Sequence, residues 1–238
     1  MTATSTSALD TGSRGQPHPF TIAVMQPYFI PYAGYFRLLA ASDLFVIYDC
    51  VQFPRRGWVH RNRLVDEAGV ERWLTLPLEK ASREILIRDL RFVKDAAVLL
   101  EKRLRSFRFP SGDRDGIANI MATLRNPQGR PVDYIEHLLG DIARYLGLPW
   151  NVIRSSTLEV PPSLRAQDRI LEIARRLGAQ RYVNAPGGRS LYDPVDFEAA
   201  GIELCFLPQY QGPSTSILSR LMTEDRNDLS GDIVKGAF

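Results

Sequence analysis

The sequence lacks several features that would assign it to a class at once. It has only two cysteines, Cys50 and Cys205, in 238 residues, so it can form neither a disulfide-dense scaffold nor a four-cysteine zinc site. Both lie in or beside apolar runs typical of strands, and we expect buried free thiols in a reducing, cytoplasmic setting. No run approaches the roughly 20 apolar residues needed to cross a bilayer, so we expect no membrane span.

Motifs for common cofactors and nucleophiles are missing as well. The chain contains no zinc-type ligand cluster, nucleophile elbow or dinucleotide fingerprint, so the sequence identifies no metal and no cofactor. The glycines of "NAPGGRSLYD" (184–193) lack the lysine and the spacing of a Walker loop, although their N–H groups could receive an anion. The formal charge of +3 is mild and evenly spread, which suits an anionic small-molecule substrate and gives no electrostatic footprint of a nucleic-acid surface.

What remains is the composition of an ordinary globular protein. Apolar residues make up 45% of the chain and charged residues 24%, and the length is sufficient for one substantial core. The first 19 residues are small and polar, and they lack the apolar centre of a secretory signal. We therefore predict a disordered leader at 1–19 and a single domain at 20–238.

The apolar pattern predicts an α/β fold. "FTIAVMQ" (20–26) and "LFVIYD" (44–49) are typical of buried strands, and "AGYFRLLAASD" (33–43) between them has helical spacing. Strand, helix and strand in this order favour a parallel, Rossmann-like sheet. "WVHRNRLV" and "VERWLTLPL" flank the turn "DEAG" and predict a β-hairpin, which two helices at 95–108 and 114–125 follow. Hairpin and helices would form an insertion at about 51–130.

The rest of the chain continues the alternation. We predict helices at about 131–146, 164–179, 194–201 and 214–222, strands at 150–156, 181–184 and 202–208, and a polar tail. His137 lies on the first of these helices, where we expect a structural histidine. Ligands of open parallel sheets bind beyond the carboxyl ends of the strands, so we expect the functional site in the segments that follow them.

The segment "QPYFIPYAGYF" (26–36) follows the first strand directly. Tyr28, Tyr32 and Tyr35 each carry a hydroxyl that needs a partner if the ring is buried. Two prolines reduce the entropy lost when the loop is fixed, and Gly34 permits a close approach of another group. We predict that the loop forms a preorganised wall of a ligand pocket. The alternative is that its rings only pack a rigid turn.

The segment "DCVQFPRRGWVHRNR" (49–63) is the richest in polar groups. Arginine suits bidentate recognition of phosphate or carboxylate, and we expect Arg56 and Arg61 to neutralise such a group. Asp49 or His60 would move a proton near neutral pH. Alternatively, alternation along a strand would send half of these side chains to a solvated face.

Three blocks of the chain together resemble the WbqC-like family. They are "MQPYFIPYAGYFRLLAASDLFVIYDCVQFPRRGWVHRNRL", "YVNAPGGRSLYDPVDFEAAGIELCFL" and "STSILSRLM", and the resemblance covers about 20–230. It gives weight to Gln26, Pro27, Tyr35, Asp49, Gln52, Trp58, Arg61, Asn62, Asn184, Gly188 and Tyr192. At the position of His60 the family pattern often has asparagine or another polar residue. The resemblance implies a bacterial sugar or specialised-metabolite pathway, because such proteins are associated with O-antigen and natural-product gene clusters.

A second, fainter likeness is to nucleotidylyltransferases of the HxGH class. It rests on the proline-containing loop, the glycine at a helix start and the late Ser-Thr-Ser helix. In those enzymes two histidines stabilise the phosphate transition state, and here Tyr32 and Tyr35 stand at the matching places. A neutral tyrosine supplies no cationic clamp, so the likeness implies the nucleotidylyltransferase-like fold more than its chemistry.

Three hypotheses of function follow from the sequence. The first is a biosynthetic transferase that moves an acyl or aminoacyl group onto an amine such as an amino sugar, with a charged tRNA among the candidate donors. The alternatives are a nucleotidyl-transfer or ATP-dependent activating enzyme and a non-catalytic binding partner in a biosynthetic cluster. The candidate catalytic residues are Asp49, His60 and Tyr35. The candidate binding residues are Gln26, Tyr28, Tyr32, Gln52, Arg56, Arg61, Asn62, Asn184, Gly188 and Tyr192.

Overall fold

The computed structural model of the chain describes residues 18–66, 68–107, 109 and 116–237. The predicted leader, apart from its last two residues, lies outside the described residues. So do most of the turn-rich stretch at 110–116 and one residue of the hairpin turn, at position 67.

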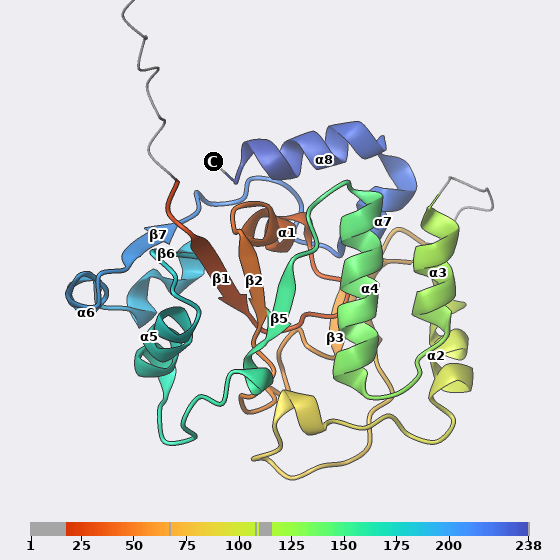
Figure 1. Ribbon diagram of the computed structural model, residues 1–238. Helices are drawn as coiled ribbons and strands as arrows, with labels where there is room; N and C mark the ends of the chain where they lie inside the picture. The colour runs from red at the N-terminus through yellow and green to blue at the C-terminus, as the bar shows by residue number, and fades with distance from the viewer. Residues whose placement is uncertain (1–17, 67, 108, 110–115, 238) are drawn as a thin grey trace, which may run out of the picture.

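Five parallel strands form the central sheet in the order β5-β2-β1-β6-β7 (Figure 1). Their bounds are Thr21–Met25 for β1, Leu44–Ile47 for β2, Val152–Arg154 for β5, Arg181–Asn184 for β6 and Glu203–Phe206 for β7. The chain runs from β1 through β2 to β5 in one direction, then crosses to β6 and β7 on the other side of β1. The protein therefore has the predicted Rossmann-like α/β fold, and its topological switch point lies between β1 and β6.

The inner strands β1 and β2 are buried on both faces, as their continuous apolar runs predict. Ile22, Val24 and Val46 pack in one core with α5 and α6, while Ala23 and Phe45 face a larger core on the other side. The helices of the sheet are α1 at Ala33–Ala40, α4 at Pro131–Tyr145, α5 at Ala166–Arg176, α6 at Pro194–Ala199 and α7 at Ile217–Thr223. Short 3-10 turns follow β5 at Ser155–Thr157 and β6 at Pro186–Leu191.

A separate antiparallel hairpin follows β2, as predicted. Its strands are β3 (Arg61–Val65) and β4 (Glu71–Thr75). A 3-10 turn at Ile87–Asp89 and the helices α2 (Ala96–Leu104) and α3 (Ile117–Arg125) come next. Alternate hairpin residues, Leu64 and Leu74 among them, enter the same apolar core as α2, α3 and the central sheet. The hairpin is therefore packed against the sheet domain on one face and leaves its other face outward.

The predicted polar tail forms a further helix. This helix, α8 (Arg226–Lys235), lies beside α1 (Figure 1). It buries Leu229 and Ile233, and only these two apolar residues mark its inner face, too few for a clear helical signal. The buried guanidinium of Arg37 on α1 holds the end of α8, because it donates to the carbonyl oxygens of Gly236 and, at 3.0 Å, Pro208.

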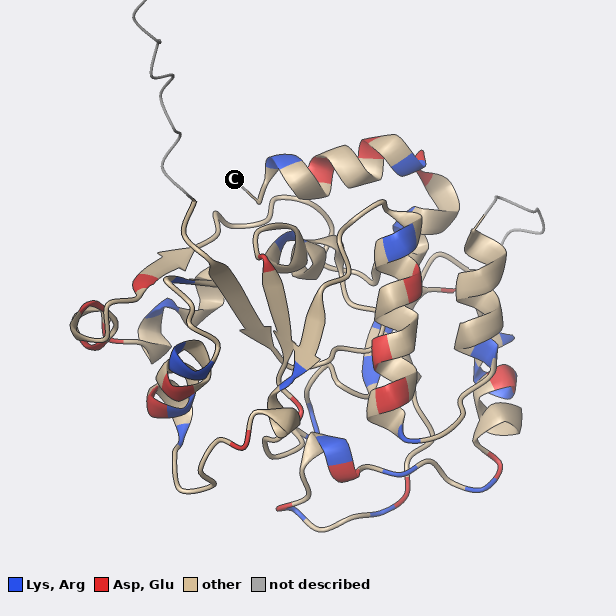
Figure 2. Cartoon of the chain, viewed as in Figure 1, with Lys and Arg blue, Asp and Glu red and all other residues tan. Residues whose placement is uncertain are grey.

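Charged residues lie mainly on outward helix faces and in the loops beyond the carboxyl ends of the strands (Figure 2). The strands β1 and β2 contain none. Among the described residues, no helix is long and apolar enough to span a membrane, and both cysteines are unpaired and half-buried.

Replacing Arg37 by methionine tests how α8 is held. The substitution keeps an apolar stem but leaves two carbonyl groups without their donor, so we expect the free energy of unfolding to fall by about 3 kcal/mol. Urea unfolding measures this loss, and limited proteolysis should then cut within 226–235. The control Arg125→Met removes an exposed ion pair with Glu101 (Nε–Oε2 3.6 Å) and should cost less than about 1 kcal/mol. Equal losses in both variants would contradict a special role for Arg37.

Candidate functional site

A cavity of about 460 Å³ opens at the topological switch point, beyond the carboxyl ends of β1 and β6. This volume is in the range typical of small-molecule sites. We call it the switch-point cavity. It is lined by Val24, Met25, Gln26, Tyr28, Tyr32, Gly34, Tyr35, Leu38, Tyr48, Trp58, Ile170, Asn184, Ala185, Gly187, Gly188, Leu191 and Tyr192. Of the three segments in which the sequence predicted ligand contacts, the aromatic loop and the loop after Asn184 both contribute to this cavity, and the segment 49–63 contributes only Trp58.

The aromatic loop contains one residue with a strained backbone, and hydrogen bonds from two other segments hold it in that conformation. Ile30 has a φ of 39°, a left-handed conformation that a β-branched residue rarely adopts. Its carbonyl oxygen accepts hydrogen bonds of 2.7 Å from both Asn62 Nδ2 and Ser216 Oγ. Asn62 Nδ2 also donates to the carbonyl oxygen of Phe29 at 3.1 Å. Both donor side chains are buried, so the loop is fixed by the hairpin on one side and by the start of α7 on the other.

The tyrosines of the loop form the first wall of the cavity. Tyr35 is buried, and its hydroxyl donates to the carbonyl oxygen of Gln26 at 3.0 Å, which ties α1 to the end of β1. A side chain at Gly34 would approach Tyr32 Cε2 to 2.2 Å, so only glycine allows that ring to lie against the helix. The close approach predicted for Gly34 is therefore made by a side chain of the same loop.

The loop after β6 forms the opposite wall. Asn184 is buried, and its Oδ1 accepts a hydrogen bond of 2.7 Å from the N–H of Ala185. A Cβ at Gly188 would lie 2.5 Å from Asn184 Nδ2, so the glycine lets the turn close over the amide. The hydroxyl of Tyr192 lies 3.2 Å from that of Tyr182 in the core below. This network fixes Asn184 and Tyr192 at the rim before any ligand arrives.

None of the residues that line the cavity carries a charge. Burial raises the pKa values of Tyr28, Tyr32 and Tyr192, and it raises that of Tyr35 well above the ordinary value of 10.0. The phenols are therefore neutral hydrogen-bonding groups in the physiological pH range. Among the described residues, the side-chain amide of Gln26 and the hydroxyls of Tyr28 and Tyr32 have no hydrogen-bond partner, so they remain available to a ligand.

Asp49 lies outside the switch-point cavity. Its carboxylate is fully buried behind the end of β2, where it accepts hydrogen bonds from Ser155 Oγ (3.0 Å), Ser156 N (2.9 Å) and Ser156 Oγ (2.7 Å). These contacts connect β2 to the turn after β5. They use both carboxylate oxygens, so Asp49 stabilises the sheet edge.

His60 and the predicted anion-binding arginines lie on the hairpin side. The His60 ring packs edge-on against Phe53 with centroids 4.9 Å apart, and its buried Nδ1 has no hydrogen-bond partner. Burial, with a smaller effect from Arg61, lowers the pKa of His60 from 6.5 to about 4. Arg56 is exposed, and Arg61 lies over the ring of Trp73. None of these side chains lines the switch-point cavity.

Gln52 lines a second cavity of about 500 Å³, on the other side of Tyr48. The most buried charge there is Arg169, whose three guanidinium nitrogens donate to the carbonyl oxygens of Leu164, Cys50 and Pro161. The guanidinium thus holds the chain between β5 and α5, and each of its three nitrogens already donates to a carbonyl oxygen.

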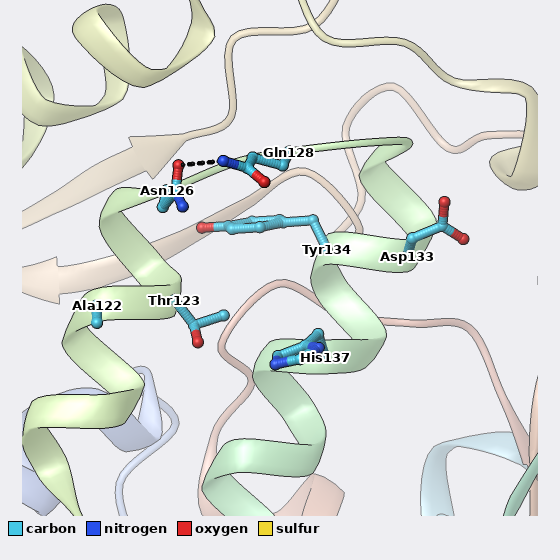
Figure 3. A pocket seen from close by; sticks show the side chains of 7 residues that line it. All are labelled: Ala122, Thr123, Asn126, Gln128, Asp133, Tyr134 and His137. Atoms are coloured by element: carbon cyan, nitrogen blue, oxygen red, sulfur yellow. Dashed lines mark hydrogen bonds between the residues drawn. The ribbon is translucent and has the colours of Figure 1, made fainter.

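A third cavity, of about 410 Å³, lies between α3 and α4 (Figure 3). His137 lines it and has a side chain 67% exposed, with Nε2 3.9 Å from Asp141 Oδ1. Tyr134 projects from α4 toward Asn126, and its hydroxyl donates to the carbonyl oxygen of Leu124 at 2.8 Å. No residue of the predicted site lines this cavity. Among the described residues, no three His, Cys, Asp or Glu side chains are grouped as a metal would require.

Three residues that line or support the cavity, Tyr48, Trp58 and Ser216, are not among the predicted catalytic or binding residues. Tyr48 directly follows β2, so its position beyond a strand end was a usable signal. Trp58 belongs to the block that resembles the WbqC-like family but was not selected for the site. Ser216 acts through the backbone of a loop far away in sequence, and no local pattern marks such a contact.

Comparison with known proteins gives one family and one relative. The family model described as "WbqC-like protein family" matches residues 26–215, which include both walls of the switch-point cavity. "Uncharacterized protein Rv1507c" of Mycobacterium tuberculosis is 27% identical over 197 residues, covering 80% of this chain and 83% of that protein. No solved structure matches the chain.

Replacing Asn62 by alanine tests the clamp on the aromatic loop. The substitution removes both hydrogen bonds from Nδ2, one of them to the strained Ile30, and should lower the free energy of unfolding by about 2 kcal/mol. Urea unfolding followed by circular dichroism measures the loss. The control Asn126→Ala removes an exposed amide and should change stability by less than about 0.5 kcal/mol. A loss at Asn62 no larger than that of the control would argue against the clamp.

The pH dependence of stability tests the environment of His60. Because its pKa is about 4 in the folded protein and ordinarily 6.5, the unfolded chain binds more protons between these values. The contribution of neutral His60 is present above pH 6.5 and is lost as the pH falls toward 4. We expect His60→Gln to lose less stability than the wild type between about pH 7.5 and pH 4.5, measured as the midpoint of thermal unfolding. His137→Gln, at an exposed position, serves as the control, and identical profiles for His60→Gln and wild type would refute the assignment.

Proposed function

The chain belongs to the WbqC-like protein family, and on that premise we propose that it is a biosynthetic transferase that moves an acyl or aminoacyl group onto the amine of a small polar acceptor such as an amino sugar. The observation that carries the proposal is the neutral, ring-walled cavity at the switch point, in which hydroxyl and amide groups converge from two strand ends. Location at the switch point is typical of ligand sites in open α/β sheets.

The chemistry of the lining suits a polar but uncharged ligand. The rings of Tyr28, Tyr32 and Trp58 offer apolar faces, and Gln26 and Asn184 offer amide groups that both donate and accept. A sugar presents the same combination, with C–H faces and hydroxyl groups around one ring. A few placed polar groups in an aromatic pocket also give orientation and specificity.

None of the lining residues has a carboxylate side chain, and this affects the protonation of an amine bound in the cavity. A buried amine without a carboxylate partner is disfavoured in its protonated form, so its pKa falls on binding. The free base is the nucleophilic form. The cavity thus favours an acceptor amine that is ready to attack a carbonyl carbon.

The transfer needs only the acceptor amine and an acyl group on its carrier. The amine nitrogen forms a bond to the acyl carbon, the bond from that carbon to the carrier's sulfur or oxygen breaks, and the amine proton leaves with the carrier atom. Tyr28 and Gln26 would hydrogen-bond the acceptor during this exchange, since the Tyr28 hydroxyl and the Gln26 side-chain amide have no hydrogen-bond partner among the described residues. Neither Asp49 nor His60 lines the switch-point cavity, so neither is given a part in the exchange.

Nucleotidyl transfer or ATP-dependent activation is the second candidate. It is favoured by the strand order and by the packing of α7, whose N-cap residue Ser216 donates a hydrogen bond to the carbonyl oxygen of Ile30 in the aromatic loop. In HxGH-class nucleotidylyltransferases two histidines stabilise the phosphate transition state. The lining of the switch-point cavity includes no Lys, Arg or His, which weighs against binding of a triphosphate there.

Ligand-dependent thermal stabilisation tests the proposal with a panel of nucleotide-linked amino sugars, the matching sugars without the amine, and nucleoside triphosphates with magnesium. An amino sugar at 100 times its dissociation constant should stabilise the protein by about 2.7 kcal/mol. Tyr28→Phe and Gln26→Leu should each weaken its binding by about tenfold, because each removes one hydrogen bond.

The control for these variants is Tyr145→Phe, which alters a phenol that does not line the switch-point cavity. It should leave binding unchanged. Stabilisation only by a triphosphate with magnesium would replace the proposal with activating chemistry. Binding of amino sugars that is indifferent to Tyr28→Phe and Gln26→Leu would move the acceptor site elsewhere.

A further inference from the structure

The outer face of the β3–β4 hairpin carries an aromatic and basic surface that the proposed acceptor site does not use in full. Trp58 and Trp73 lie with ring centroids 5.3 Å apart, and Arg61 and Arg63 lie against them. We call these four residues the hairpin platform. Trp73 is 45% exposed, although tryptophan is usually well covered in proteins.

The strand register explains why the platform faces outward. Arg63 pairs with Trp73 across the hairpin and Arg61 pairs with Thr75, so these side chains share one face. The alternate residues Leu64 and Leu74 point into the core. The platform is therefore a cross-strand cluster on a rigid element, and each of its side chains is supported by a neighbour.

The platform keeps a net positive charge. Arg63 forms an ion pair with Glu71 (Nη1–Oε2 2.9 Å). Arg61 lies 4.2 Å above the ring of Trp73, and its Nη2 donates to the carbonyl oxygen of Arg56 at 2.9 Å. Within the described part of the chain, no carboxylate lies within ion-pair distance of Arg61. An arginine stacked on tryptophan and left without a carboxylate is suited to an anionic partner.

The platform is continuous with the switch-point cavity. Trp58 lines that cavity, and it also lines a small adjoining hollow of about 130 Å³ with Tyr28, Tyr32 and Arg63. A ligand in the cavity could thus extend past Trp58 onto the platform. Such a ligand would need a planar, apolar group to pack against tryptophan and an adjacent anionic group to contact the arginines.

We propose that the hairpin platform binds a phosphorylated nucleoside, with the base packed against the exposed part of Trp73 that Arg61 leaves uncovered and a phosphate held by Arg61 and Arg63. Base stacking on an aromatic ring together with arginine contacts to phosphate is a general mode of nucleotide binding. The role of this nucleotide, as the carrier end of the group donor, rests on the proposed transferase function. The binding itself rests only on the platform.

A nucleotide of this kind occurs in two classes of donor, a small thioester carrier built on a nucleotide and the end of an acylated RNA. The full-length protein would be titrated by calorimetry with ADP, with coenzyme A and with a short single-stranded RNA. ADP should bind saturably and more weakly as salt is raised, because a phosphate contact releases counterions. Tighter binding of coenzyme A than of RNA assigns the small carrier, and the reverse order assigns RNA.

Three variants locate the nucleotide. Trp73→Ala and Arg61→Met should each weaken ADP binding by about tenfold or more. Arg72→Met is the matched control, since this exposed arginine is on the same strand and pairs with Asp66 away from the platform. Trp73→Phe keeps a ring and should retain most of the affinity. Unchanged urea unfolding shows that each variant is folded.

The proposal is overturned if none of the three probes binds, or if Trp73→Ala and Arg61→Met bind ADP as the wild type does. Its failure is separate from failure of the transferase function. Tyr28→Phe and Gln26→Leu should keep ADP binding while they weaken amino-sugar binding. ADP binding without amino-sugar binding would reject the proposed acceptor, whereas the opposite result would reject the platform alone.

Discussion

The carbonyl oxygen of Ile30 accepts hydrogen bonds from Asn62 and Ser216, and the wall of the switch-point cavity depends on this contact. The residue is held in a left-handed conformation that costs of the order of 1–2 kcal/mol for an ordinary side chain. Two buried, uncharged donors offset that cost. A loop rich in rings and prolines thus becomes a fixed surface because a hairpin and a helix hold its backbone.

Charge is distributed around this wall in a consistent way. The cavity has neutral phenols and amides, whereas arginines gather on the adjoining hairpin. Burial keeps the phenols protonated, since a phenolate would lose its hydration there. The two surfaces meet at Trp58, which lines the cavity and packs against Trp73 of the platform. A two-part ligand, neutral at one end and anionic at the other, fits this division better than a ligand of uniform charge.

The sequence was sufficient to predict the sheet and the strand ends that meet at the cavity, because apolar runs and their order dictate a parallel sheet. It also pointed to Gln26, Tyr28 and Asn184 for the same reason. The sequence did not distinguish these residues from Asn62 and Asp49, which make buried structural hydrogen bonds. A polar residue gives the same sequence pattern in a ligand site and in a structural contact. The partner of Ser216 lies 186 residues away, and α8 has too few apolar residues to be recognised.

The long separation between Ile30 and Ser216 also determines when the cavity can exist. Synthesis proceeds from the N-terminus, and the early strands and the hairpin can pair before the last helices have left the ribosome. Until residue 216 has emerged, the carbonyl oxygen of Ile30 in the aromatic loop lacks one of its two hydrogen-bond donors. The cavity wall that follows β1 is therefore incomplete at first. The wall of the cavity is therefore complete only after both ends of this 186-residue separation have been synthesised.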